Sequence, residues 1–212
     1  SSTAEPAPVR PRYIIRDAAY ALQPRPPINK VVENLLNAGS VSLFFGEPGS
    51  KKTSSILSLA VCVALGKPWV GFATQAVKVL VIDEENGENR IALRLAAAIR
   101  GELGDASTQI EFISLAGFKL DQPTAVQEIE KLVRERGIGL VIIDALAEIM
   151  DGDENSKQDV QPVLSAIRKI AETTLAAIIL IHHSNRNVAY RGSSAIKGSI
   201  DLMVQVESDN GS

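Results

Sequence analysis

The sequence predicts an α/β fold with a mostly parallel central sheet that helices flank on both faces. Short apolar runs such as 77–82 and 139–143 alternate along the chain with longer segments whose apolar residues recur at helical spacing. A glycine-bearing turn also separates the apolar run at 40–45 from the helical segment that follows it. Strands that alternate with helices pair in parallel, because each crossover returns the chain to the same end of the sheet.

Residues 1–29 are predicted to form a Pro-rich N-terminal arm or linker. Six prolines in this stretch limit both helix continuity and ladder hydrogen bonding, although a short helix is expected near 17–22. Such an arm could lie against a neighbouring subunit of a ring or form a disordered leader, and the sequence leaves both readings open.

Residues 30–212 are predicted to form one domain in which strands and helices follow one another. The expected elements are a helix at 30–38, a strand at 40–45, a helix at 52–65, a strand at 77–82, a helix at 89–99, a strand at 110–115, a helix at 124–135, a strand at 139–143, a helix at 156–172, a strand at 176–181, a helix at 194–199 and a strand at 202–206.

Composition limits the classes of function. The chain has 212 residues, 45% of them hydrophobic, which suits one sizeable core. Its net charge of −3 gives no global basic field for nucleic acid or an anionic membrane. The lone Cys62 cannot form an internal disulfide, and neither a membrane span nor a signal peptide is evident, so we expect a cytoplasmic protein. A start at Ser1 suggests a piece of a longer parent chain.

The turn at 46–53 has the pattern of a nucleotide-binding P-loop. The usual pattern is glycine, four free positions, then glycine, lysine and serine or threonine, and only Lys51 departs from it. Lys52 is then the phosphate-facing lysine, and Thr53 the hydroxyl that holds Mg²⁺. The alternatives are a turn that binds nothing and a P-loop disabled by Lys51. The predicted cofactor-binding residues are Gly46, Glu47, Pro48, Gly49, Ser50, Lys51, Lys52, Thr53 and Ser54.

Polar residues follow three other predicted strands, and the carboxyl ends of parallel strands are where ligands gather. Asp144 follows the apolar run LVII in the manner of a Walker B aspartate, which would hold Mg²⁺ with Thr53; the alternative is a turn-capping aspartate. The acidic cluster 83–85 offers a carboxylate to polarise an attacking water, unless it is a solvated loop. Of His182 and His183, one could donate to a γ-phosphate while the other packs internally.

The ordered segments GEPGSKKT, VLVIDEEN, GLVIIDAL, IILIHHSNR and RGSSAIKGSID resemble the RecA-like P-loop ATPases. Within them, the resemblance is to the branch of the DnaB-type and plasmid RepA-type hexameric replicative helicases, and it covers residues 27–206. It implies a RecA-like fold, ATP and Mg²⁺ as cofactors, and a homo-oligomeric, hexameric ring. It also implies that Glu85 is the catalytic base and His183 the sensor of the γ-phosphate.

The resemblance further implies that the loop 184–192 lines a channel and touches single-stranded DNA. It carries Arg186, Tyr190 and Arg191, which suit phosphate pairing and base stacking, although a mobile polar loop is the alternative. Arg191 and Lys197 are candidates for a cation that acts on a neighbouring subunit's ATP. The acidic stretch 148–154 after Asp144 would repel phosphate, so DNA contact is not expected there.

The sequence therefore predicts Mg²⁺-dependent ATP hydrolysis, in a DNA helicase or a replication-associated ring ATPase. The first alternative is a nucleotide-dependent switch or assembly module with little turnover, which Lys51 and the acidic stretch favour. The second alternative is a P-loop kinase for a small substrate. A kinase would need a lid with several arginines, and no such cluster appears in the sequence.

Overall fold

The computed structural model describes residues 15–25, 27–47, 49–154, 156–183 and 194–207. Its centre is a six-stranded sheet with the order β5-β4-β6-β7-β3-β8, in which every neighbouring pair is parallel. The strands are β3 (Val41–Gly46), β4 (Lys78–Asp83), β5 (Ile110–Ser114), β6 (Ile138–Asp144), β7 (Ala177–His183) and β8 (Leu202–Gln205). This arrangement confirms the predicted α/β fold with a parallel sheet.

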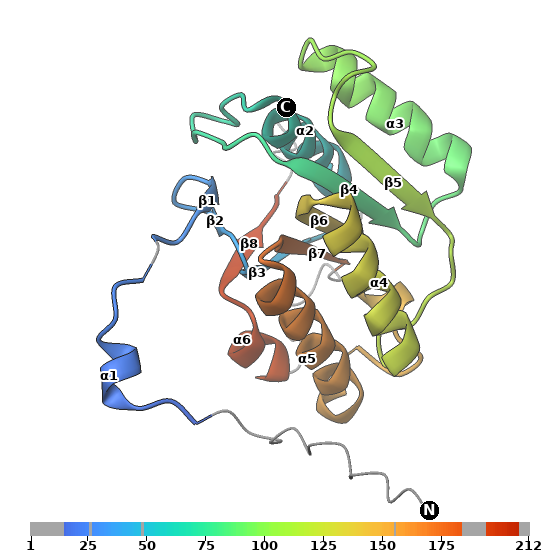
Figure 1. Ribbon diagram of the computed structural model, residues 1–212. Helices are drawn as coiled ribbons and strands as arrows, with labels where there is room; N and C mark the ends of the chain where they lie inside the picture. The colour runs from blue at the N-terminus through green and yellow to red at the C-terminus, as the bar shows by residue number, and fades with distance from the viewer. Residues whose placement is uncertain (1–14, 26, 48, 155, 184–193, 208–212) are drawn as a thin grey trace, which may run out of the picture.

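Helices cover both faces of this sheet (Figure 1). One face packs against α2 (Lys52–Leu65) and α3 (Glu88–Gly101), and the other against α4 (Pro123–Arg136), α5 (Lys157–Thr174) and α6 (Ser194–Ser199). Successive residues of the strands point to opposite faces, so both faces of a central strand are apolar. In β6, for example, Val141 belongs to the α5 side of the core and Ile142 to the α2 side.

The register of the strands brings their carboxyl ends together. Asp83 at the end of β4 lies beside Asp144 at the end of β6. Gly46 at the end of β3 lies beside His183 at the end of β7. Because β4, β6, β7 and β3 are consecutive neighbours in the sheet, three polar strand ends and the start of the glycine-bearing turn lie along one edge.

The helix predicted at 30–38 is wrong. This segment forms an antiparallel hairpin of β1 (Lys30–Val32) and β2 (Leu36–Asn37), which Asn34 turns in a left-handed conformation with φ 61°. Tertiary contacts decide the outcome, since Glu33 N–H donates to the Ala73 carbonyl and buried Val32 bridges Thr74. The short helix expected near 17–22 is found as α1 (Ala18–Ala21), which the Asp17 side chain caps.

The other predicted elements are confirmed. The helices at 52–65 and 194–199 have the predicted bounds, and the remaining elements differ by one or two residues at an end. The division into an arm at 1–29 and a domain at 30–212 stays a prediction. Among the described residues, no helix combines the length and apolar character needed to cross a membrane.

Replacing Gly46 by alanine tests how tightly the sheet edge is packed where β3 enters the turn. An added Cβ would lie 2.2 Å from the backbone carbonyl oxygen of Val206, so the backbone directly after β8 would have to move. We expect Gly46→Ala to lower the free energy of unfolding by about 1–3 kcal/mol, as overpacked sites do. Urea denaturation measures this change.

Gly101→Ala is the control, because a Cβ at this helix end meets no atom within 4 Å. We expect it to leave stability unchanged or slightly higher, since alanine is the better helix former. An unfolding curve for Gly46→Ala that overlays the wild-type curve would contradict the packing described for β3 and β8.

Candidate functional site

The turn between β3 and α2 presents a helix N-terminus to solvent-accessible space. Gly49 has φ 84°, and Lys51, the residue before α2, has φ 60° and ψ 19°, so both take left-handed conformations. Glycine adopts this conformation freely, whereas for a residue with a Cβ the left-handed conformation is less stable by about 1–2 kcal/mol. The Lys51 side chain is exposed. A lysine at the position where the usual pattern has glycine therefore strains the backbone of the turn, but its side chain does not fill the space inside the turn. The first N–H groups of α2 have no partner within the helix and can bind an anion.

Lys52 is the buried cation of this turn. Its side chain is 3% exposed, and its Nζ donates to the carbonyl oxygens of Gly46 and Glu47, each at 2.7 Å, and to Ser50 Oγ at 3.2 Å. Burial lowers the pKa of Lys52, and the nearby Asp144 and Glu85 carboxylates oppose that shift. The three acceptors that Lys52 has among the described residues are neutral oxygens, so phosphate oxygens could replace them.

Thr53 and Asp144 meet across the site, from α2 and from the end of β6. Thr53 Oγ1 donates to Asp144 Oδ2 at 2.9 Å. Asp144 is 2% exposed, and its other oxygen, Oδ1, has no hydrogen-bond partner among the described residues. A hydroxyl and a buried carboxylate whose second oxygen accepts no hydrogen bond are the hard ligands that Mg²⁺ prefers. The residues present therefore fit a magnesium ion.

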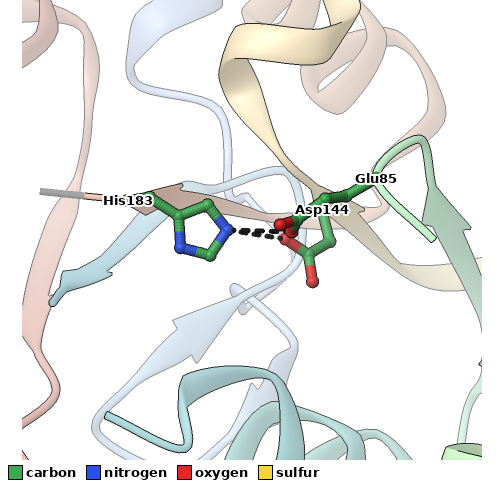
Figure 2. Close-up of side chains that lie close together, drawn as sticks. All are labelled: Glu85, Asp144 and His183. Carbon is green, nitrogen blue, oxygen red and sulfur yellow. Dashed lines mark hydrogen bonds and ion pairs between the residues drawn. The ribbon is translucent and has the colours of Figure 1, made fainter. Parts of the chain in front are cut away.

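His183, at the end of β7, directs one ring nitrogen toward two carboxylates, that of Asp144 at the end of β6 and that of Glu85 just after β4 (Figure 2). Its Nε2 is 3.0 Å from Glu85 Oε2 and 3.6 Å from Asp144 Oδ1. The Asp144 carboxylate raises the pKa of His183 above its usual value, with help from Glu85 and against the effect of burial. The raised pKa favours the protonated imidazole, which can pair with both acids. The two acids and the histidine also have the spacing of a metal-binding group.

Only Glu85 of the predicted acidic cluster 83–85 is exposed; the other two acids are buried and hold the loop. Asp83 accepts from the backbone N–H groups of Glu85 and Asn86, at 3.0 and 2.7 Å, and burial raises its pKa. Glu84 accepts from the N–H groups of Ala116 and Gly117, at 2.9 and 2.8 Å. The fixed loop directs Glu85 toward the P-loop.

The second histidine is internal, as expected for one of the pair. His182 is 6% exposed, and its Nδ1 lies 3.1 Å from Glu154 Oε2. This contact ties the end of β7 to the acidic stretch after β6.

A cavity of about 550 Å³ lies beside the P-loop, with Glu85 and His183 in its lining. This volume is usual for a small-molecule site. The lining of the cavity includes three residues that sequence reasoning missed: Asn86, Arg90 and Arg94. The two arginines lie one helical turn apart on α3, five and nine residues after Glu85, and that spacing was the available signal. The cavity is lined by Gly49, Lys51, Lys52, Thr53, Ser54, Glu85, Asn86, Arg90, Arg94 and His183.

Several predicted residues cannot be assigned to this cavity. Pro48, Arg186, Tyr190 and Arg191 lie outside the described residues. Lys197 belongs to α6, and at this position the structure describes the backbone. Their roles toward DNA or a neighbouring subunit stay predictions.

Comparison with known proteins agrees with this geometry. A protein-family model described as an AAA domain matches residues 5–189 of the chain. The chain is also similar to the DNA repair protein RadA of Mycobacterium tuberculosis strain CDC 1551 / Oshkosh, with 26% identity over 186 residues that cover 86% of this chain and 35% of the relative. RadA of strain ATCC 25618 / H37Rv gives the same values.

The chain thus spans 35% of the length of these curated relatives. The family match covers most of the chain, and it agrees with the parallel sheet and with the P-loop at the end of β3. The chain belongs to the AAA domain family, as a RecA-like P-loop ATPase domain.

Proposed function

We propose that this domain binds ATP with Mg²⁺ and hydrolyses it in the cavity between the P-loop and the ends of β4, β6 and β7. One observation carries the proposal: Lys52, Thr53, Glu85 and His183 line a single cavity, and the buried Asp144 contacts two of them, Thr53 and His183. Each supplies a different function that phosphoryl transfer to water requires.

In this mechanism Lys52 turns from the loop carbonyls to the phosphates, which the first N–H groups of α2 also bind. Thr53 and Asp144 would hold Mg²⁺, which would neutralise phosphate charge when bound. Glu85 accepts the proton of the attacking water, since it is the one acid of the 83–85 cluster that reaches the cavity. His183 contacts this base and reports whether the γ-phosphate is present.

The same ATPase acts on single-stranded DNA as part of a ring of identical subunits. The similar RadA proteins are named as DNA repair proteins, which supports a role on DNA. The order of the motifs supports the branch of DnaB-type and plasmid RepA-type helicases. Since the net charge is −3, DNA contact would rely on a local basic segment, and 184–192 with Arg186 and Arg191 is our candidate.

A nucleotide-dependent switch with little turnover is the second candidate function. The contact between Glu85 and His183, 3.0 Å from Oε2 to Nε2, favours it, because a carboxylate engaged by another side chain is less available to activate water. A phosphate-release assay with and without single-stranded DNA distinguishes the two. Stimulation by DNA supports the motor, whereas ATP binding without phosphate release supports the switch.

Lys52→Ala is expected to abolish ATP binding, because it removes the buried ammonium that faces the phosphates. Lys51→Ala is the matched control, since this neighbouring lysine is exposed. We expect it to change affinity little. Calorimetric titration of both variants with MgATP measures the difference, and equal losses would show that the two lysines have been assigned wrongly.

Glu85→Gln is expected to slow ATP hydrolysis by about 10²–10⁴-fold, the usual contribution of a general base. ATP binding should persist, because the P-loop is unchanged. The control is Glu88→Gln, which removes the same charge from an exposed position in the first turn of α3. Hydrolysis by Glu85→Gln at the wild-type rate would exclude Glu85 as the base.

The ion pairs of His183 predict a pH dependence in the nucleotide-free protein. Because the folded-state pKa of His183 is raised, its contribution to stability is complete below the unfolded-state pKa and is lost as pH rises through the folded-state value. Histidine NMR titration should give a pKa above the usual 6.5, and Glu85→Gln should lower it. A wild-type value at or below 6.5 would contradict the bridging geometry.

A further inference from the structure

Three side chains that can ligate a metal meet at the edge of the sheet: those of Glu85, Asp144 and His183 (Figure 2). His183 Nε2 is 3.0 Å from Glu85 Oε2 and 3.6 Å from Asp144 Oδ1. Nitrogen and carboxylate ligands bind Zn²⁺ at about 2.0–2.2 Å, so two ligands of one four-coordinate ion lie about 3.4 Å apart. The two distances at His183 therefore suit a single ion that the three side chains share.

The two oxygens of the Asp144 carboxylate face different partners. Oδ2 accepts a hydrogen bond from Thr53 Oγ1 at 2.9 Å. Oδ1 lies toward His183 and accepts no hydrogen bond from a described residue, although Asp144 is only 2% exposed. A buried carboxylate oxygen without a hydrogen bond is unfavourable, and a bound cation compensates for it. This oxygen indicates a cation on the His183 side of Asp144, in addition to one on the Thr53 side.

The His183 ring can supply a lone pair to such an ion. Two carboxylate oxygens and a bare imidazole nitrogen are all acceptors, so either a proton or a metal ion has to lie between them. Nδ1 of the same ring has no hydrogen-bond partner among the described residues and can carry the proton of the neutral ring. Nε2 then offers its lone pair to a metal ion.

The mixed ligand set determines which class of ion the site takes. Mg²⁺ prefers oxygen ligands and keeps several waters, whereas an imidazole suits Zn²⁺ and other first-row transition metals. Glu85 and His183 also line the cavity of about 550 Å³, so water can reach the ion from that side. Three protein ligands and one position open to water are the usual arrangement of an accessible zinc site.

We propose that Glu85, Asp144 and His183 form a transition-metal site that takes Zn²⁺ and differs from the Mg²⁺ site of Thr53 and Asp144. The bound ion occupies the Glu85 carboxylate and engages the Asp144 oxygen that Thr53 leaves unused. Zn²⁺ therefore inhibits ATP hydrolysis, because Glu85 is no longer available to activate water. The inhibition rests on the proposed function, whereas the metal site does not.

Metal binding in the absence of nucleotide tests the site. Zn²⁺ is titrated calorimetrically into the full chain in a large excess of Mg²⁺, and Co²⁺ absorption reports the geometry of the bound ion. We expect one Zn²⁺ per chain with these ligands, and a higher unfolding temperature when Zn²⁺ is present. Glu85→Gln and His183→Ala should each weaken Zn²⁺ binding at least about 100-fold, since even the outer partners of metal ligands contribute 10–100-fold.

Glu88→Gln is the matched control, because it removes the same charge from an exposed position of α3. We expect it to bind Zn²⁺ as the wild type does. Glu85 is exposed, so Glu85→Gln should fold even if His183→Ala does not, and thermal unfolding without metal checks both variants. Equal Zn²⁺ affinity in the wild type and Glu85→Gln would overturn the proposal, and so would folded wild-type protein that does not bind Zn²⁺ saturably.

ATP hydrolysis tests the inhibition separately. Free Zn²⁺ is buffered in a reaction with MgATP, because ATP also binds the ion. We expect the rate to fall at the concentrations that saturate the site and to recover when a chelator removes Zn²⁺. Protein that binds Zn²⁺ through Glu85 and His183 but never hydrolyses ATP would support the metal site and refute the ATPase. Hydrolysis at the full rate with the site saturated would refute the inhibition.

Discussion

Asp144 keeps a carboxylate in the interior of the protein, and much of the site compensates for its burial. A buried charge is costly unless it is paired or hydrogen-bonded. Thr53 Oγ1 supplies one hydrogen bond, and the His183 imidazole lies 3.6 Å from the other oxygen. The Asp144 carboxylate also interacts electrostatically with the Lys52 ammonium of the P-loop, whose charged form it favours. The Asp144 oxygen that accepts no hydrogen bond can still interact with a further positive charge, and this makes the site suitable for a magnesium ion.

The parallel sheet sets this arrangement in place. A carboxylate at the end of β6 can meet partners from β3, β7 and β4 because those strands are its neighbours or next neighbours and all run the same way. The apolar residues of both faces hold the strands in register, with Ile142 against α2 and Val141 against the α5 layer. A shift of one residue would turn each polar strand end to the opposite face of the sheet.

Much of this fold could be predicted because its signals are local. The apolar run before Asp144 and the glycine-bearing turn before α2 each lie within a few residues of the feature that they predict. The hairpin at 30–37 could not be predicted this way, since its pairing with Ala73 and Thr74 comes from about forty residues away. Local pattern there was compatible with a helix, and distant backbone hydrogen bonds decided otherwise.

The candidate site shows the same division. Sequence order indicated Lys52, Thr53 and Asp144, which the structure brings together. Sequence order did not show that Glu84 is buried and Glu85 exposed. The backbone N–H groups of 116–117, which bind Glu84, belong to the loop after β5, far from Glu84 in the sequence. Arg90 and Arg94 belong to no sequence motif used in the prediction. The structure identified them as site residues because it places α3 beside the P-loop.

The central claim is that a nucleoside triphosphate with Mg²⁺ binds at the end of β3. Calorimetric titration of folded wild-type protein with a slowly hydrolysed ATP analogue tests it most directly, in the presence of Mg²⁺ and again with the metal chelated. We predict saturable binding of one nucleotide per chain that weakens when Mg²⁺ is removed. Absence of binding heat at several temperatures, with the protein shown to be folded, would contradict the account.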